Sequence, residues 1–135
     1  MAQYSPPQRP RALIVEDEII IALDLEATVH ALGFDVCGLA PSASEAKAIA
    51  MADQPDVVLM DVNLEGGREG IEAARWLRVV CGAAVVFVTS HTDGGTVERI
   101  QQQVPGAPVL SKPILQNQLA NAILKAGSIS LPNSP

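Results

Sequence analysis

Asp56-Val57-Val58-Leu59-Met60-Asp61 is the stretch around which the rest of the sequence is organised. Its four apolar residues predict a buried strand that presents the carboxylate of Asp61 at its C-terminal end. The residues from 62 to 67 are typical of a turn. Ligands of open parallel α/β sheets bind at the carboxyl ends of the strands. An ordinary turn aspartate is an equal alternative for Asp61 taken alone, and the other strand ends decide between the two.

The composition favours one folded domain with an aliphatic core. Of the 135 residues, 48% are hydrophobic but only 3% are aromatic. The formal net charge is −6, and the nine lysines and arginines are scattered along the chain. Phosphate backbones are bound by clustered basic residues. We therefore expect no nucleic-acid partner.

Two cysteines, Cys37 and Cys81, lack the spacing of a metal site. We interpret both as small buried hydrophobic residues in a reducing compartment. No apolar run is long enough for a membrane span or a signal peptide. We therefore expect a cytoplasmic protein with no membrane partner.

Apolar runs and helical patterns alternate along the chain. Strands are expected at 11–15, 35–40, 57–60, 83–88 and 107–110. Helices are expected at about 18–32, 42–52 (capped by Ser42 or Ser44), 68–80, 96–103 (after a loop through Gly94 and Gly95) and 115–126. Short connections imply right-handed crossovers, so we predict an α/β fold with a doubly wound five-stranded parallel sheet and five helices. Residues 1–10 are expected to form a disordered tail, residues 11–127 the domain, and residues 128–135 a second tail.

The first predicted helix has apolar residues on two faces. One face forms the core stripe, while Ile19, Ile20 and Leu23 lie on the opposite side, where a surface helix is normally polar. Single exposed apolar residues are ordinary, but these three cluster within one turn. We interpret them as a partner-docking face. In the last helix, Leu115 is expected to point inward with Leu119 and Ile123.

Polar side chains follow four of the five predicted strands. They are Glu16 and Asp17, Asp61, Thr89 and Ser90, and Lys112. In a doubly wound sheet these strand ends meet at one crevice. Carboxylates crowded together repel each other, and Mg²⁺, which prefers oxygen ligands and often accompanies phosphate, relieves that repulsion. A lysine and a hydroxyl complete a site for a phosphoryl group.

The sequence lacks the motifs of the common hydrolases and nucleotide-binding proteins. It has neither a Ser-His-Asp ordering nor GxSxG, and no glycine-rich phosphate loop follows the first strand. The available nucleophile is the carboxylate of Asp61, which would form an aspartyl phosphate.

With these motifs, residues 11–127 resemble the receiver domains of two-component response regulators, which have a flavodoxin-like fold. The resemblance rests on Glu16-Asp17, Asp61, Thr89-Ser90 and Lys112-Pro113, in that order. It implies that Asp61 is the phosphoacceptor and that Glu16, Asp17, Asp61 and the Asn63 carbonyl hold Mg²⁺. It also implies that Thr89 is the switch hydroxyl, that Lys112 contacts the phosphoryl group, and that the Lys112-Pro113 peptide is cis.

Two positions depart from the pattern of many receivers. Val109 stands where an aromatic residue usually rotates inward on activation, so threonine–aromatic coupling cannot be assumed. His91, two residues after Thr89, occupies a position that tunes the lifetime of the aspartyl phosphate, although a solvated loop histidine is the favoured interpretation. Phe87-Val88-Thr89-Ser90 loosely resembles the Phe-Ala-Thr-Gly loop of some stand-alone receivers.

The resemblance favours a stand-alone phosphoacceptor that is not an enzyme in the usual sense. Its expected partners are a histidine kinase or a histidine phosphotransferase, and a downstream protein target. One alternative is a small phosphatase with Asp61 as nucleophile, but haloacid-dehalogenase-type enzymes have a second acid where this chain has Asn63. The other is a degenerate receiver that only binds proteins, against which the intact acids and Lys112 argue.

Overall fold

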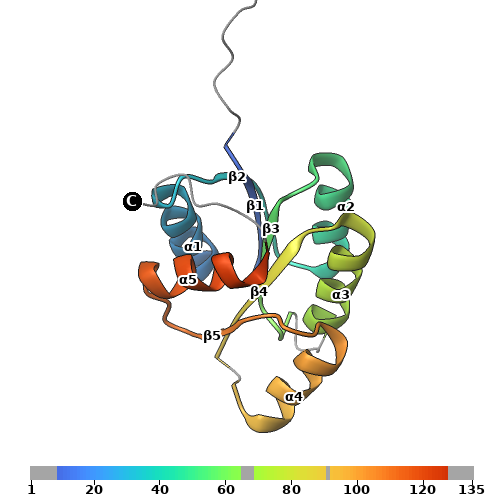
Figure 1. The fold of residues 1–135 in the computed structure, drawn as a ribbon. Helices are drawn as coiled ribbons and strands as arrows, with labels where there is room; N and C mark the ends of the chain where they lie inside the picture. The colour runs from blue at the N-terminus through green and yellow to red at the C-terminus, as the bar shows by residue number, and fades with distance from the viewer. Residues whose placement is uncertain (1–8, 65–68, 91, 128–135) are drawn as a thin grey trace, which may run out of the picture.

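The computed structural model describes residues 9–64, 69–90 and 92–127, and within them five strands alternate with five helices (Figure 1). The elements are β1 (Arg11–Val15), α1 (Ile19–Ala31), β2 (Asp35–Ala40), α2 (Ala43–Asp53), β3 (Val57–Met60), α3 (Glu69–Cys81), β4 (Ala84–Thr89), α4 (Gly94–Gln103), β5 (Val109–Ser111) and α5 (Gln116–Ala126). Most of the two predicted tails, and His91, lie outside the described residues.

The five strands form one parallel sheet in the order β2-β1-β3-β4-β5. Helices α1 and α5 cover one face, and α2, α3 and α4 lie on the other (Figure 1). The predicted doubly wound α/β fold is thus confirmed. Because all strands run in the same direction, β1, β3, β4 and β5 end at one side of the sheet, which we call the carboxyl edge; the opposite side is the amino edge.

Both faces of the sheet are buried, which explains why the central strands are continuously apolar. Side chains alternate along each strand, so Val58 and Met60 pack under α2 and α3, while Val57 and Leu59 pack under α1 and α5. All four are fully or almost fully buried. The strand that carries Asp61 at its end is therefore held on both sides by the core.

The first helix has the two faces that the sequence predicts. Ala22, Leu25 and Val29 are buried in the core. On the opposite side the exposed fractions are 61% for Ile19, 80% for Ile20 and 49% for Leu23. This apolar surface, which we call the α1 patch, lies beside the carboxyl edge, because α1 begins three residues after Glu16.

Several local predictions were wrong. Helix α4 begins at Gly94, not Thr96, because Asp93 caps it: its Oδ1 accepts a hydrogen bond from the Thr96 amide at 2.9 Å. Strand β5 contains only 109–111, because its pairing partners in β4 begin at Phe87.

The interior position expected for Leu115 was also wrong. It precedes α5 as the N-cap residue and is 63% exposed. The two cysteines are half-buried rather than buried, and both are free thiols. Each packs at the border of the core instead of inside it. None of the helices in the described residues is long and apolar enough to cross a membrane.

Candidate functional site at the carboxyl edge

The backbone pairing of the sheet places Asp61 next to Glu16. Strands β1 and β3 pair in register up to Val15 and Met60. The Asp61 amide then donates to the Val15 carbonyl at 3.0 Å, so the ladder continues one residue beyond the strand. On the other side of β4, the Lys112 amide donates to the Thr89 carbonyl at 3.0 Å. Residues far apart in sequence are thereby fixed at one edge by main-chain hydrogen bonds.

A single ammonium group joins the two acids. Nζ of Lys112 lies 2.9 and 3.0 Å from the two carboxylate oxygens of Glu16, and 3.2 Å from Oδ2 of Asp61. Glu16 and Asp61 are both buried, with exposed fractions of 3% and 6%. Ion pairs that are removed from solvent are screened much less than surface pairs, so this contact holds the geometry of the site.

The electrostatics show an excess of negative charge. Burial and, next, a hydrogen bond with Asp61 raise the pKa of Glu16 to about 7, although Lys112 lowers it. Burial also lowers the pKa of Lys112, but contacts with Glu16 and Asp61 outweigh this and raise it above the usual value. One lysine therefore does not fully compensate the buried acids, and a cation is favoured at this edge.

The remaining predicted metal ligands lie around this pair. Asp17 is exposed, and its carboxylate lies with those of Glu16 and Glu18 in a group whose oxygens are within 4.8 Å of one another. The Asn63 amide donates to Oδ1 of Asp61 at 3.3 Å. An all-oxygen donor set with a raised glutamate pKa fits a hard divalent cation such as Mg²⁺. Glu18, the residue directly before α1, is the added member of the acidic group.

The hydroxyl-bearing strand end has one buried and one exposed residue. Thr89 is the last residue of β4 and is fully buried, whereas Ser90 is exposed. Val109 pairs with Phe87 in the adjacent strand and is half-buried. The Lys112-Pro113 peptide is cis.

Sequence reasoning missed two features of this edge. Oγ of Ser111 donates to the Thr92 hydroxyl at 3.2 Å and so links β5 to the loop after β4. Gly70, in the first turn of α3, lies directly against the backbone of Asp61. Glycine within a helical pattern was the available signal for the second feature; nothing in the sequence indicated the first.

A family model for the response regulator receiver domain matches residues 12–124 of this chain. The chain belongs to the response regulator receiver family. This membership places the receiver domain in two-component signalling, as the sequence predicted. The site described above lies within the matched region.

Curated relatives are longer than this chain. It is 39% identical over 82 residues to the phyllosphere-induced regulator PhyR of Methylorubrum extorquens, covering 60% of this chain and 31% of PhyR. It is 34% identical over 113 residues to the transcriptional regulatory protein PdtaR of Mycobacterium tuberculosis, covering 84% of this chain and 54% of PdtaR. The chain therefore spans about a third and about half of the length of these two relatives.

Solved structures show the same fold. The receiver domain of a modulated diguanylate cyclase from Desulfovibrio desulfuricans superposes with a TM-score of 0.79 at 34% identity, covering 88% of this chain and 94% of that one. The receiver domain of PhyR from Erythrobacter litoralis gives a TM-score of 0.75 at 28% identity, covering 94% and 95%.

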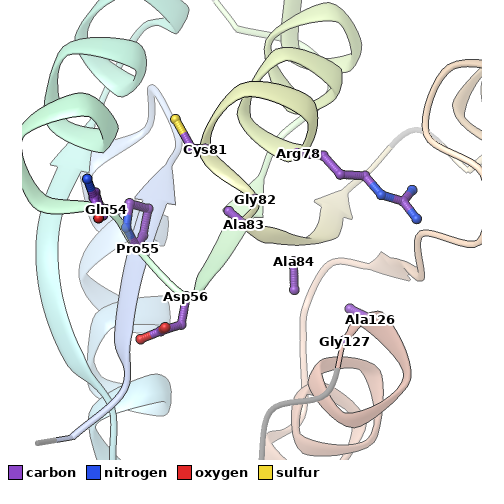
Figure 2. A pocket seen from close by; sticks show the side chains of 10 residues that line it. All are labelled: Gln54, Pro55, Asp56, Arg78, Cys81, Gly82, Ala83, Ala84, Ala126 and Gly127. Atoms are coloured by element: carbon purple, nitrogen blue, oxygen red, sulfur yellow. The ribbon is translucent and has the colours of Figure 1, made fainter.

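A different hollow lies at the amino edge of the receiver domain (Figure 2). Its volume is about 480 Å³, and its lining includes small residues such as Ala83, Ala84 and Ala126. The charged side chains of Asp56 and Arg78 point away from each other on opposite sides of it (Figure 2). Arg78 instead donates to the Pro105 carbonyl at 2.6 Å. The two charged residues that line this hollow do not converge on a ligand position, whereas those of the carboxyl edge do.

Proposed function

We propose that this receiver domain, comprising residues 11–127, accepts a phosphoryl group on Asp61 from a phosphohistidine of a histidine kinase or histidine phosphotransferase in the cytoplasm. The observation that carries the proposal is the contact of Lys112 Nζ with both Glu16 and Asp61, at 2.9 to 3.2 Å. A buried carboxylate beside a fixed ammonium group can attack phosphorus while the lysine neutralises charge on the phosphoryl oxygens.

The transfer exchanges one bond to phosphorus for another. A carboxylate oxygen of Asp61 forms the new P–O bond, the P–N bond to the donor imidazole breaks, and the imidazole leaves with the electron pair of that bond. Lys112 keeps its proton throughout, consistent with its raised pKa. The Asn63 amide at Oδ1 restrains the rotation of the nucleophile, and the hydroxyl of the buried Thr89, at the end of β4, is proposed to donate to a phosphoryl oxygen.

Glu16, Asp17, Asp61 and the Asn63 carbonyl would hold Mg²⁺. When bound, the ion neutralises charge on the phosphoryl group. Support for this assignment comes from the excess of buried acid over base at the carboxyl edge. Phosphorylation would then depend on Mg²⁺.

The donor is proposed to bind at the α1 patch of Ile19, Ile20 and Leu23. A cavity of about 300 Å³ lies between this helix and the residues after β5, and Ile21, Pro113 and Ile114 line it together with Lys112. A protein seated there would reach both the patch and the site. Interface energy concentrates in a few buried apolar contacts, and the α1 patch supplies three.

The output is proposed to be contact with a downstream protein. Because position 109 carries valine, this position supplies no aromatic ring whose rotation could be coupled to Thr89. Thr89, at the end of β4, and the following Ser90 are proposed to sense the phosphoryl group, and His91 is proposed to tune its lifetime.

Labelling with acetyl phosphate tests the proposal. Incubation with Mg²⁺ should add one phosphoryl group to Asp61, detected by mass spectrometry, and chelation of Mg²⁺ should prevent it. No labelling would instead indicate a domain that only binds proteins. Steady hydrolysis of a phosphomonoester would indicate the phosphatase alternative. That alternative is disfavoured because position 63 carries asparagine instead of a second acid.

A further inference from the structure

Gly70 lies in the first turn of α3 and is buried. A Cβ atom at this position would meet the carbonyl oxygen of Asp61 in a clash, and would lie 2.8 Å from the carbonyl oxygen and 2.9 Å from the Cα of Val62. All three are backbone atoms, which cannot rotate aside as a side chain can. Any residue larger than glycine must therefore displace α3 or the chain that carries Asp61.

The reason for glycine here is space, not backbone conformation. Gly82 and Gly106 have φ angles of +70° and +80°, and nothing lies within 4 Å of a Cβ built on either of them. Gly70 shows the opposite combination, with close neighbours and no positive φ. Helix α3 thus approaches the Asp61 backbone more closely than any side chain permits.

This contact completes a clamp on the nucleophile. On one side, the Asp61 amide donates to the Val15 carbonyl of β1 at 3.0 Å. On the other, the Gly70 amide donates to the Val62 carbonyl at 3.3 Å. Between them lies the segment whose Asn63 amide holds Oδ1 of Asp61. The two peptide units after β3 are therefore fixed from both directions.

We propose that Gly70 is a positioning residue, which sets the Asp61 carboxylate and the Asn63 backbone for phosphoryl transfer through the direct contact of α3 with the Asp61–Val62 backbone. The inference rests on the proposed function of Asp61. A displacement of about 1 Å at a reacting group can cost a hundredfold in rate, so even a partial shift should be measurable.

The test compares three variants in the acetyl phosphate assay. Each rate is divided by the concentration of folded protein and is measured at a temperature well below the unfolding transition. Gly70→Ala should lower the maximal labelling rate, measured at saturating Mg²⁺, at least tenfold. It should also weaken the binding of Mg²⁺. Gly94→Ala is the matched control, because Gly94 is also in the first turn of a helix and has nothing within 4 Å of its Cβ position. Ile71→Val removes one carbon from the buried residue beside Gly70 and so loosens the same turn while leaving Gly70 itself unchanged. Both controls should label like the parent.

Two results would overturn the inference. The first is labelling of Gly70→Ala at the parent rate. The second is equal slowing of Gly70→Ala and Ile71→Val, which would assign the effect to general packing of α3. A parent that is not labelled at all would instead defeat the proposed function, and Gly70 with it. The two failures are thus distinct.

The parent protein decides the matter if Gly70→Ala does not fold. Addition of Mg²⁺ and then beryllium fluoride, a mimic of the phosphoryl group, should shift the NMR resonance of the Gly70 amide. The Gly82 amide, at the amino edge, should stay in place and serves as reference. If the Gly70 resonance shifts no more than that of Gly82, the start of α3 is not energetically coupled to the site, and the inference is wrong.

Discussion

Asp56 and Asp61 stand immediately before and after the same four-residue strand, β3, and yet their surroundings differ in kind. Oδ2 of Asp56 accepts a hydrogen bond from the Arg11 amide at 2.8 Å and the residue is exposed. Asp61 is buried and contacts the ammonium group of Lys112 and the amide of Asn63. Asp56 accepts a hydrogen bond from the backbone at the amino edge, whereas Asp61 lies among the charged groups of the carboxyl edge.

The difference follows from what each edge of the sheet supplies. At the carboxyl edge, side chains from the ends of β1, β3 and β5 meet within hydrogen-bonding distance. At the amino edge, Arg78 turns away to a carbonyl and Asp56 turns towards a backbone amide (Figure 2). A hollow is therefore a poor guide to function by itself, and convergent charged groups are a better one.

The largest expected effect separates the two aspartates directly. Asp61→Asn should abolish labelling by acetyl phosphate, because the nucleophile is gone, while the fold and its stability persist since like-charge crowding with Glu16 is relieved. Asp56→Ala should label at the parent rate and lose about 1 kcal/mol of stability, the usual worth of one hydrogen bond, because it removes the acceptor of the Arg11 amide. Mass spectrometry and urea unfolding measure the two quantities. Labelling of the Asp61→Asn protein on another aspartate at the parent rate would break the comparison.

Removal of Asp17, an exposed acid of the carboxyl edge, should have the next largest effect. Asp17→Ala should weaken Mg²⁺ binding and slow labelling about 100-fold, because a bound ion supplies several kcal/mol of charge stabilisation and each ~1.4 kcal/mol is tenfold. Asp53→Ala, which removes an acid paired with Arg11 at the amino edge, should leave both unchanged. Calorimetric Mg²⁺ titration of the two variants is the measurement. Equal Mg²⁺ affinities would remove Asp17 from the site.

A smaller effect concerns the surface beside the carboxyl edge. Ile20→Ser with Leu23→Ser should slow phosphotransfer from the cognate protein donor about tenfold, a loss of ~1.4 kcal/mol, as expected for one good apolar contact. Acetyl phosphate needs no docking and should label the variant normally. Val79→Ser with Val80→Ser is the control, since both valines are exposed on α3. If both phosphodonors slow together, the α1 patch supports the fold instead of a partner.

The smallest expected effect is on stability against pH in metal-free buffer. The pKa of Glu16 is about 7 in the folded protein and near the ordinary glutamate value of 4.5 in the unfolded chain. Between these values the folded state holds a proton that the unfolded chain has released, so stability falls as pH rises through this window. Glu16→Gln should remove this part of the slope, measured by urea unfolding at pH 5 and pH 8. An unchanged slope would mean that Glu16 does not titrate in this range.

Much of the fold could be predicted because its signals are local. The apolar run at β3, Gly33 with its φ of 97° after α1, and the Ser42 cap of α2 each depend on neighbouring residues only. The bounds of β5 depended on its partner strand and could not be predicted from local sequence. The start of α4 was missed because the Asp93 cap was not recognised. Leu115 was placed inside because periodicity does not show which residue is the N-cap.

For the site, the sequence by itself determined the residue types and their order: acids after β1, an aspartate after β3, a hydroxyl at the end of β4 and a lysine after β5. A parallel sheet then requires that these ends share one edge. Only the tertiary structure decided that the ammonium group of Lys112 contacts both Glu16 and Asp61, and that Gly70 lies against the Asp61 backbone. Such contacts join residues up to 96 positions apart, and their distances follow from how helices and strands pack, which no local pattern records.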